Sequence, residues 1–297
     1  MKNIFSRRSV LKTIAGSAAA ISTTAFLPRT LHASEIEDSL SELKLKGHIN
    51  HSVCKWCYPN IPLEDLCKAA KKIGLSSIEL LGPDEWPTLK KYDLTCAMPW
   101  GADKGLLKGF NDPMLHDELV ARYEAMIPKA ANSGLKQIIC FSGQRNGISD
   151  ELGLENCAKG LKRLTPLAEK HKIIISMELL NSKETKDYQC DHTKWGVELV
   201  KMVGSDQFKL LYDIYHMQMM EGDVIATIEA SHPYISHYHT GGVPGRHEID
   251  DTQELYYPAI MKAIVDTGYK GFVGQEFIPK NPDPLASLKK SIQICDV

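Results

Sequence analysis

From residue 47 onward, short apolar or β-branched runs alternate with longer stretches in which apolar residues recur at helical spacing. The stretches at 62–73 and 117–130 have the periodicity of amphipathic helices. The short runs have the length and composition of buried parallel strands, and they lie at 47–53, 76–81, 94–99, 136–142, 173–178, 208–213, 234–239 and 271–276. This alternation predicts an α/β fold, a single (β/α)8 TIM barrel that is closed by a helix at 284–295.

The beginning of the chain does not share this pattern. SRRSVLK at 6–12 precedes a small, weakly apolar run and then LHA at 31–33, a sequence that resembles a twin-arginine export signal. We therefore expect residues 1–33 to be a signal peptide, residues 34–297 to be the barrel domain, and the mature protein to be exported to the periplasm. A basic N-terminal tail or an uncleaved anchor is the alternative interpretation.

Membrane insertion is not expected once the signal is removed, because no other stretch approaches the roughly 20 apolar residues of a spanning helix. The charged residues 34–46 are expected to form a helix or an extension that covers the closed end of the barrel.

Composition and charge restrict the partners of the chain. Its 297 residues are 43% hydrophobic and 24% charged, an ordinary globular balance. The full chain carries a formal charge of −2, and without residues 1–33 it has 30 basic against 37 acidic residues, a charge of −7. This sign disfavours a nucleic-acid partner and leaves a small molecule as the expected one. Both a monomer and a homo-oligomer are compatible with the sequence.

Acidic or imidazole side chains follow the ends of four successive predicted strands. They are Glu178, Asp213, His239 and Glu276. The carboxyl ends of parallel barrel strands meet at one face, where such barrels keep their chemistry. Three carboxylates and one imidazole suit a divalent cation such as Mn²⁺, Mg²⁺, Co²⁺ or Zn²⁺. A single acidic residue at a strand end is more often a helix cap or a solvated loop residue, so the prediction depends on all four together.

Further polar and aromatic residues lie close to these strand ends. His216 comes three residues after Asp213, and Arg246 lies in a glycine-rich loop where its planar fork suits an oxygen-rich substrate. Trp100 could stack on a sugar ring, and His51 could form a wall of the pocket. A structural histidine and a packing tryptophan are the alternatives.

Eight cysteines would usually suggest disulfides in an exported protein. Cys67, Cys96, Cys140 and Cys295 lie in apolar surroundings and are expected in the core. The CKWC sequence at 54–57 follows the first strand, and a lone pair of this kind is a weak signal for zinc or redox chemistry. A wall of the pocket is the favoured role for Cys54 and Cys57, with a labile disulfide as the lesser option.

Several sequences in the second half of the chain resemble a known family. They are ELLNSK at 178–183, GVELVKMVGS at 196–205, KLLYDIYHMQMMEGD at 209–223, PGRHE at 244–248 and YYP at 256–258. Together they are similar to the hydroxypyruvate isomerase branch of the xylose isomerase-like sugar isomerase and epimerase barrels. The resemblance covers essentially all of 47–297 and is strongest from 173 to 280.

The resemblance implies roles for individual residues. The metal positions of the family fall on the same four side chains, Glu178, Asp213, His239 and Glu276, and its two acid–base carboxylates fall on Glu178 and Glu276. Substrate-binding positions of related ketose 3-epimerases fall on Glu184, His216 and Arg246. One position departs from the pattern, because the hydroxypyruvate isomerases carry Gln where this chain has His239, as the ketose epimerases do.

The expected activity is therefore metal-dependent proton transfer through an enediolate, on a small sugar, keto-sugar or hydroxy-keto acid. A lyase or dehydratase acting on an oxidised sugar such as a 3-keto-glycoside uses the same intermediate and is the nearest alternative. An endonuclease IV-like phosphodiesterase would need more histidine ligands and a basic surface. A non-catalytic sugar-binding barrel would need no cation.

Overall fold

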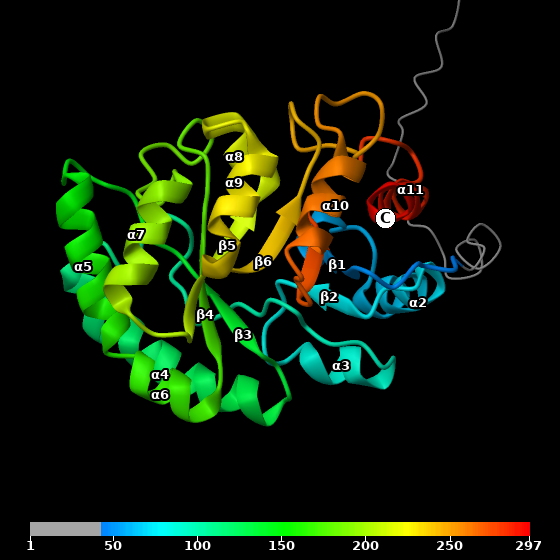
Figure 1. The fold of residues 1–297 in the computed structure, drawn as a ribbon. Coiled ribbons are helices and arrows are strands. Elements are labelled where there is room, and N and C mark those ends of the chain that lie inside the picture. The colour runs from blue at the N-terminus through cyan, green and yellow to red at the C-terminus, as the bar shows by residue number, and fades with distance from the viewer. Residues whose placement is uncertain (1–42) are drawn as a thin grey trace, which may run out of the picture. The chain divides into compact units, whose positions relative to one another are not determined.

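A parallel sheet organises the fold (Figure 1). The computed structural model describes residues 43–297. Within them the strand order is β2-β1-β7-β6-β5-β4-β3, and every pairing is parallel. The strands are β1 (Asn50–Cys54), β2 (Ser77–Glu79), β3 (Gln137–Cys140), β4 (Ile174–Glu178), β5 (Phe208–Asp213), β6 (Ile235–Thr240) and β7 (Phe272–Gln275). The predicted α/β barrel class is confirmed.

The strands read as nearly continuous apolar runs because both faces of the sheet are covered. All four residues of β3 are buried. In β1, β4 and β7 every residue after the first is buried. A parallel sheet of this kind needs helices on its outer face and side chains filling its interior.

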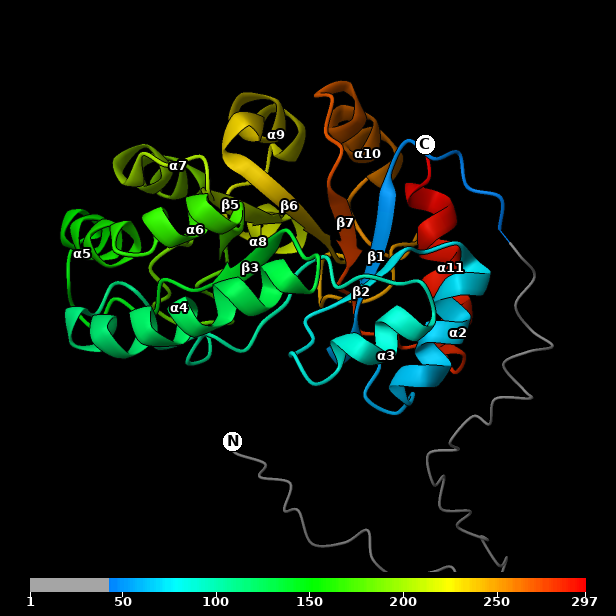
Figure 2. The same ribbon diagram turned by 90° about the horizontal axis from the view of Figure 1, so that it is seen from below.

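Helices supply that outer cover and surround the curled sheet when it is seen from below (Figure 2). They are α2 (Leu63–Ile73), α3 (Trp86–Lys91), α4 (His116–Asn132), α5 (Asp150–Lys162), α6 (Thr165–His171), α7 (Thr193–Val203), α8 (Ile214–Met220), α9 (Val224–Ser231), α10 (Tyr257–Asp266) and α11 (Pro284–Cys295). Short 3₁₀ turns are η1 (Lys55–Cys57), η2 (Pro113–Leu115) and η3 (His232–Tyr234). The predicted helices at 62–73, 117–130 and 284–295 correspond to α2, α4 and α11.

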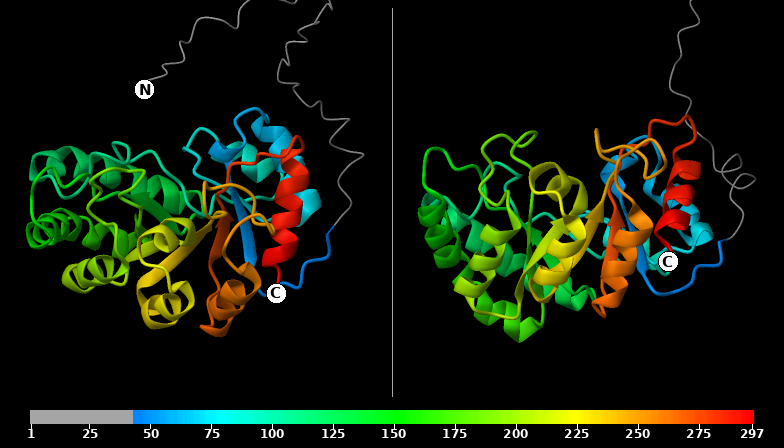
Figure 3. Two further views of the ribbon diagram at one scale, coloured as in Figure 1. Left: turned by 90° about the horizontal axis from the view of Figure 1, so that it is seen from above. Right: turned by 45° about the horizontal axis from the view of Figure 1, so that its top comes forward.

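The first and last helices lie side by side, although more than 200 residues separate them in the sequence (Figure 3). The N-cap Asp283 begins α11, and its carboxylate accepts hydrogen bonds from the backbone N–H of Leu285 and Ala286, both at 3.0 Å. Asp296, at the end of α11, accepts a hydrogen bond from the backbone N–H of Lys46 at 2.8 Å. This last hydrogen bond joins the beginning of the described residues to their end.

The prediction of an eighth strand at 94–99 is wrong, although the segment occupies the expected place between β2 and β3. Thr95 forms an isolated parallel bridge with Ser77. Further along, the carbonyl oxygen of Met98 accepts from Leu80 N–H at 2.8 Å, and that of Pro99 accepts from Ile139 N–H at 3.1 Å.

Side chains interrupt the ladder at this segment. The backbone N–H of Ala97 donates to Ser77 Oγ at 2.9 Å, and its carbonyl oxygen accepts from Gln137 Nε2 at 3.0 Å. Pro99 has no N–H to donate. Backbone groups that would pair in a regular strand are therefore satisfied by side chains, and the barrel is bridged here by separate hydrogen bonds.

The predicted export signal at 1–33 lies outside the described residues, and so does 34–42. Residues 43–46 are not helical, and Leu43 and Leu45 pack against the core. Within 43–297, no helix combines the length and the apolar character needed to cross a bilayer.

Candidate active site

The four predicted ligands meet at the carboxyl ends of β4 to β7. Glu178 and Asp213 are the last residues of β4 and β5, His239 is the last but one of β6, and Glu276 follows β7. Because Asp213 is in register with His239, neighbouring strands present their side chains at the same level. One donor atom from each of the four lies within 4.8 Å of the others, and all four residues are buried.

The position of Asp213 is fixed by the helix that follows it. It is the N-cap of α8, and its Oδ1 accepts hydrogen bonds from the backbone N–H of Tyr215 at 2.8 Å and of His216 at 3.3 Å. Its second oxygen is left to face the other ligands. Burial raises the pKa of Asp213 to about 7, although the guanidinium of Arg246 acts in the opposite direction.

His239 directs Nδ1 toward two carboxylates. This atom lies 2.8 Å from Glu276 Oε2 and 3.4 Å from Glu178 Oε1. Burial alone would lower the pKa of His239, but the negative charge of Glu276 outweighs it and raises that pKa well above the usual value. The imidazole is therefore held in a strongly negative environment.

The two glutamates have different environments. Burial raises the pKa of Glu178. Burial also opposes the charge on Glu276, but Arg246 and His239 outweigh it and hold the pKa of Glu276 well below its usual range. Trp56 Nε1 donates to Glu276 Oε1 at 2.7 Å, which fixes the orientation of this carboxylate.

Arg246 connects the ligands to the loop above them. Its backbone has a φ of 55°, in the left-handed region. With this backbone conformation its side chain reaches the ligand residues. Its Nη2 contacts Asp213 Oδ2 at 2.8 Å and donates to Glu276 Oε2, and its guanidinium lies over the rings of Trp56 and Tyr215. Cation–π contacts of this kind hold the planar fork in place.

A hydrogen-bond network supports the substrate-binding residues that the resemblance implied. Tyr215 Oη and Asn181 Nδ2 both donate to the carboxylate of Glu184. Asn181 Nδ2 also lies 2.5 Å from His216 Nδ1, and Arg246 Nη1 lies 3.0 Å from His216 Nε2. Burial lowers the pKa of His216 well below the usual value, and its neutral ring has one N–H and one acceptor nitrogen, so a single ring nitrogen accepts a hydrogen bond from these neighbours.

A cavity of about 420 Å³ opens onto these groups. Its lining includes six of the predicted site residues, and one of them, Trp100, has 42% of its surface exposed. The predicted residues in the lining are Glu178, Glu276, Glu184, His216 and Arg246, and Trp100 completes the set.

The structure does not bring His51 to this cavity. His51 is the second residue of β1, near the amino end of the strand, and its Nε2 lies 3.7 Å from Asp296 Oδ1. Its prediction as a wall of the pocket is therefore wrong, because the chemistry lies at the opposite, carboxyl end of the sheet. Burial lowers the pKa of His51 to about 4.

Glu79 is a buried carboxylate that the sequence analysis missed. It ends β2, and its Oε1 lies 3.6 Å from His239 Nε2 while its Oε2 lies 2.9 Å from His237 Nε2. Burial opposes its charge, but His237 outweighs it and the pKa of Glu79 falls to about 2. Glu79 lies inside the predicted strand at 76–81 and not at its end, so the strand-end signal that identified the other ligands did not mark it.

Gly274 explains how Glu79 fits beside His239. A Cβ at this position would lie 1.7 Å from Glu79 Oε1 and 3.0 Å from His239 Cδ2. Only glycine leaves room for the carboxylate to approach the imidazole across β7.

Both cysteines of the CKWC sequence are buried and free. Cys54 Sγ lies 3.8 Å from Glu79 Oε1 and 3.9 Å from His239 Nε2. Burial raises the pKa of both thiols well above the usual value. Neither residue is part of the cavity lining, so the predicted pocket wall is supplied by Trp56, between them in the sequence.

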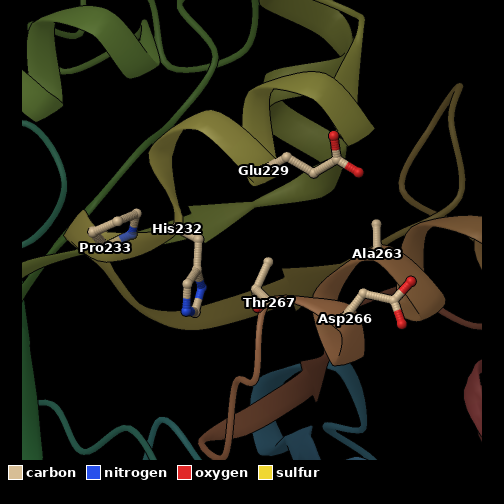
Figure 4. A pocket seen from close by; sticks show the side chains of 6 residues that line it. All are labelled: Glu229, His232, Pro233, Ala263, Asp266 and Thr267. Carbon is tan, nitrogen blue, oxygen red and sulfur yellow. The ribbon is translucent and has the colours of Figure 1, made fainter.

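A second cavity, of about 350 Å³, lies against α9 and α10 (Figure 4). Its polar side chains Glu229, His232 and Asp266 stand apart from one another and do not form one of the donor clusters found among residues 43–297. The chemistry is therefore concentrated at the ends of the strands.

Comparison with known proteins places this site in a family. The sequence profile described as xylose isomerase-like TIM barrel matches residues 67–295. Hydroxypyruvate isomerase of Escherichia coli is 31% identical over 157 residues, which cover 52% of this chain and 60% of that enzyme.

Solved structures show the same fold. The AP endonuclease, family 2, of Brucella melitensis superposes with a TM-score of 0.74 at 23% identity, over 81% of this chain and 97% of that one. The 3-keto-D-glucoside 4-epimerase of E. coli gives a TM-score of 0.70 at 15% identity, over 82% and 98% of the two chains.

Proposed function

Because the chain belongs to the xylose isomerase-like TIM barrel family, we propose that it is a metal-dependent isomerase or epimerase of a small hydroxy-ketone. The observation that carries this proposal is the buried cluster of Glu178, Asp213, His239 and Glu276 at the ends of four consecutive strands. The partial match to a hydroxypyruvate isomerase supports the same reaction type.

The donor set fits a divalent cation. Nδ1 of His239 is buried and makes no hydrogen bond within the described residues, although three carboxylates surround it. Bringing these groups together without a cation leaves like charges close to one another. Three carboxylates and an imidazole are suitable ligands for Mn²⁺, Mg²⁺, Co²⁺ or Zn²⁺. When bound, such a cation would stabilise negative charge on a substrate oxygen.

The two glutamates provide the proton transfer. One carboxylate accepts the proton from the carbon beside the substrate carbonyl, and the C–H electron pair becomes the new C=C bond while the carbonyl pair moves to oxygen. The other glutamate returns a proton to this planar intermediate. Return to the same carbon from the other face gives an epimer. Return to the neighbouring carbon gives aldose–ketose isomerisation, in which the hydroxyl proton on one oxygen of the intermediate also passes to the other oxygen.

The remaining polar residues position the substrate. Glu184, His216 and Arg246 line the same cavity and are held by hydrogen bonds to one another or to Asn181 and Tyr215. Such support places binding groups accurately at the reacting carbons. Phosphodiester cleavage on DNA is disfavoured, because the chain beyond residue 33 has more acidic than basic residues.

The test combines metal content with solvent exchange. Protein lacking residues 1–33 should bind about one divalent cation per chain, as a single site of this type would. With added Mn²⁺ it should place deuterium from ²H₂O on the carbon beside the carbonyl of a hydroxy-ketone substrate, as followed by NMR. Full cation occupancy after replacement of all four ligand residues would contradict the proposed site.

A further inference from the structure

The size of the cavity is a first indication of the substrate. Hydroxypyruvate has seven non-hydrogen atoms, and allowing each the roughly 30 Å³ that a water molecule occupies gives about 210 Å³. The cavity measures about 420 Å³. A three-carbon acid would therefore leave half of it unfilled, whereas a six-carbon sugar or its glycoside would occupy it.

The walls of the cavity away from the carboxylates are apolar. Leu80, Ile139, Phe141 and Leu180 line it beside or just beyond the strand ends. At the rim, Trp56 and Trp100 line it with 37% and 42% of their surfaces exposed. Exposed aromatic rings that line a cavity are typical of a binding surface for the apolar face of a ring.

A loop between the predicted third strand and α4 holds part of this rim. Asp103 accepts hydrogen bonds from the backbone N–H of Gly101 at 3.2 Å and of Gly105 at 2.8 Å. Both glycines have positive φ values, which the turn requires. The loop thereby presents Trp100 at one end and Leu106 at the other, and both side chains line the cavity.

The charges of the lining disfavour an acidic substrate. Four carboxylates belong to it, those of Asp103, Glu178, Glu184 and Glu276, and among its described residues the sole cationic side chain is Arg246. Arg246 already contacts the carboxylates of Asp213 and Glu276. Apart from a cation bound at the four ligand residues, a substrate carboxylate would meet no other positive charge in the lining, so toward the rim its charge would be unpaired, which is costly.

We infer that this site takes an uncharged keto-sugar of six carbons or more, free or glycosidically linked, in preference to a short keto acid. Its hydroxy-ketone end lies at Glu178 and Glu276, and the rest of its ring lies against Trp100 and Leu106. This inference rests on the proposed function, and it specifies the substrate class of the same site.

The test compares substrates that do and do not reach the rim. The full-length protein, loaded with Mn²⁺, is assayed by deuterium exchange with the ketohexoses fructose and psicose, methyl 3-keto-glucoside, dihydroxyacetone and hydroxypyruvate. At least one of the three ring-sized sugars should have a kcat/KM well above that of hydroxypyruvate.

Variants of the rim loop test where the sugar ring binds in the cavity. Trp100→Ala should lower kcat/KM for the best keto-sugar by about tenfold, as loss of one aromatic contact would, and should lower dihydroxyacetone exchange much less. Leu107→Ala is the matched control, because this side chain is 51% exposed on the same loop but does not line the cavity. It should alter neither rate.

The outcomes separate the two proposals. Preferred exchange of hydroxypyruvate would overturn the inference about the substrate while upholding the proton-transfer function. An equal loss of kcat/KM with the ketose and with dihydroxyacetone in Trp100→Ala would also overturn it. The indole ring would then act on the reacting carbons of the substrate and not on the part of the sugar that lies at the rim. Exchange of none of these compounds would overturn both.

Discussion

Glu276 contacts three different groups through its two carboxylate oxygens. Trp56 Nε1 donates to Oε1, whereas His239 Nδ1 and Arg246 Nη2 contact Oε2. The side chain is thus oriented by neighbours that do not depend on substrate. A change that keeps its shape and removes its charge should therefore affect proton transfer more than binding.

Glu276→Gln should lower kcat by roughly 10²–10⁴-fold, the usual effect of losing a general acid–base group, while substrate affinity changes much less. The measurement is steady-state kinetics with a substrate identified by deuterium exchange. Glu229→Gln, at the cavity outside the barrel, is the control and should behave as wild type. Turnover near the wild-type rate in Glu276→Gln would exclude the two-glutamate mechanism.

Glu79 acts on the site through His239. Gln137 Nε2 is a donor and lies 3.0 Å from His237 Nδ1, so this nitrogen accepts and the proton of His237 is on Nε2, facing Glu79. Glu79 Oε1 then faces His239 Nε2 and favours a proton there. With the Nε2 proton held in this way, Nδ1 of His239 would be the ring atom that gives its lone pair to a bound cation.

Glu79→Gln should therefore weaken divalent cation binding by about 10–100-fold, the range found for partners of metal-binding histidines. Equilibrium dialysis with Mn²⁺ gives the affinity, and the thermal unfolding midpoint shows whether the variant is folded. Glu118→Gln, at an exposed position of α4, is the control. Unchanged affinity in a folded Glu79→Gln would show that the carboxylate does not act through His239.

At the scale of elements, the hydrophobic pattern was sufficient to predict the strands and helices, because burial on both faces of the sheet gives each strand an apolar run. It was insufficient at 94–99, where the backbone of Ala97 pairs with the side chains of Ser77 and Gln137. Hydrogen bonds between residues 20 and 40 positions apart leave no local pattern. The four strand-end ligands could be predicted, since all lie at element boundaries, whereas the place of His51 depended on which end of β1 it occupies.

Asp283 is a helix cap whose removal should be measurable. Asp283→Ala should lower the free energy of unfolding by about 1 kcal/mol, because the N–H groups of Leu285 and Ala286 lose their acceptor. Asp283→Asn retains an acceptor oxygen and should recover most of this loss. Urea unfolding monitored by circular dichroism measures both, and equal destabilisation by the two variants would show that the cap is not the cause.

For the whole molecule, the packing of β1 against the C-terminal residues makes stability depend on pH. The pKa of His51 is about 4 in the fold, below its ordinary value, because burial disfavours its charged form. Between these two values the unfolded chain binds more protons, so this contribution is fully present above about pH 6.5 and is lost as the pH falls toward 4.

His51→Gln should therefore reduce the slope of unfolding free energy against pH in this range, by up to about 1.4 kcal/mol per pH unit. The measurement is urea unfolding at a series of pH values. His48→Gln is the control, because His48 lies near the same end of the chain with an exposed side-chain contact to Val297 O. Identical slopes of unfolding free energy against pH for wild type and His51→Gln would show that His51 is not the source of this pH dependence.

Cation binding should also stabilise the whole barrel, because its ligands come from four strands that are apart in the sequence. Three carboxylates and His239 meet within 4.8 Å only in the folded chain, so a divalent cation binds the native state and not the unfolded one. At a free Mn²⁺ concentration 100 times the Kd, the gain is about 2.7 kcal/mol. For a domain of this length that raises Tm by roughly 5–10 °C.

Asp213→Asn is the informative variant for this effect. An asparagine can still accept the hydrogen bonds from Tyr215 and His216 that begin α8, but it lacks the charge that attracts the cation. Its Tm should therefore respond weakly to Mn²⁺, and EDTA should abolish the response of the wild type. Thermal unfolding with and without Mn²⁺ measures both. If Mn²⁺ raised the Tm of Asp213→Asn as much as that of the wild type, the stabilising cation would have to bind somewhere other than at the strand ends.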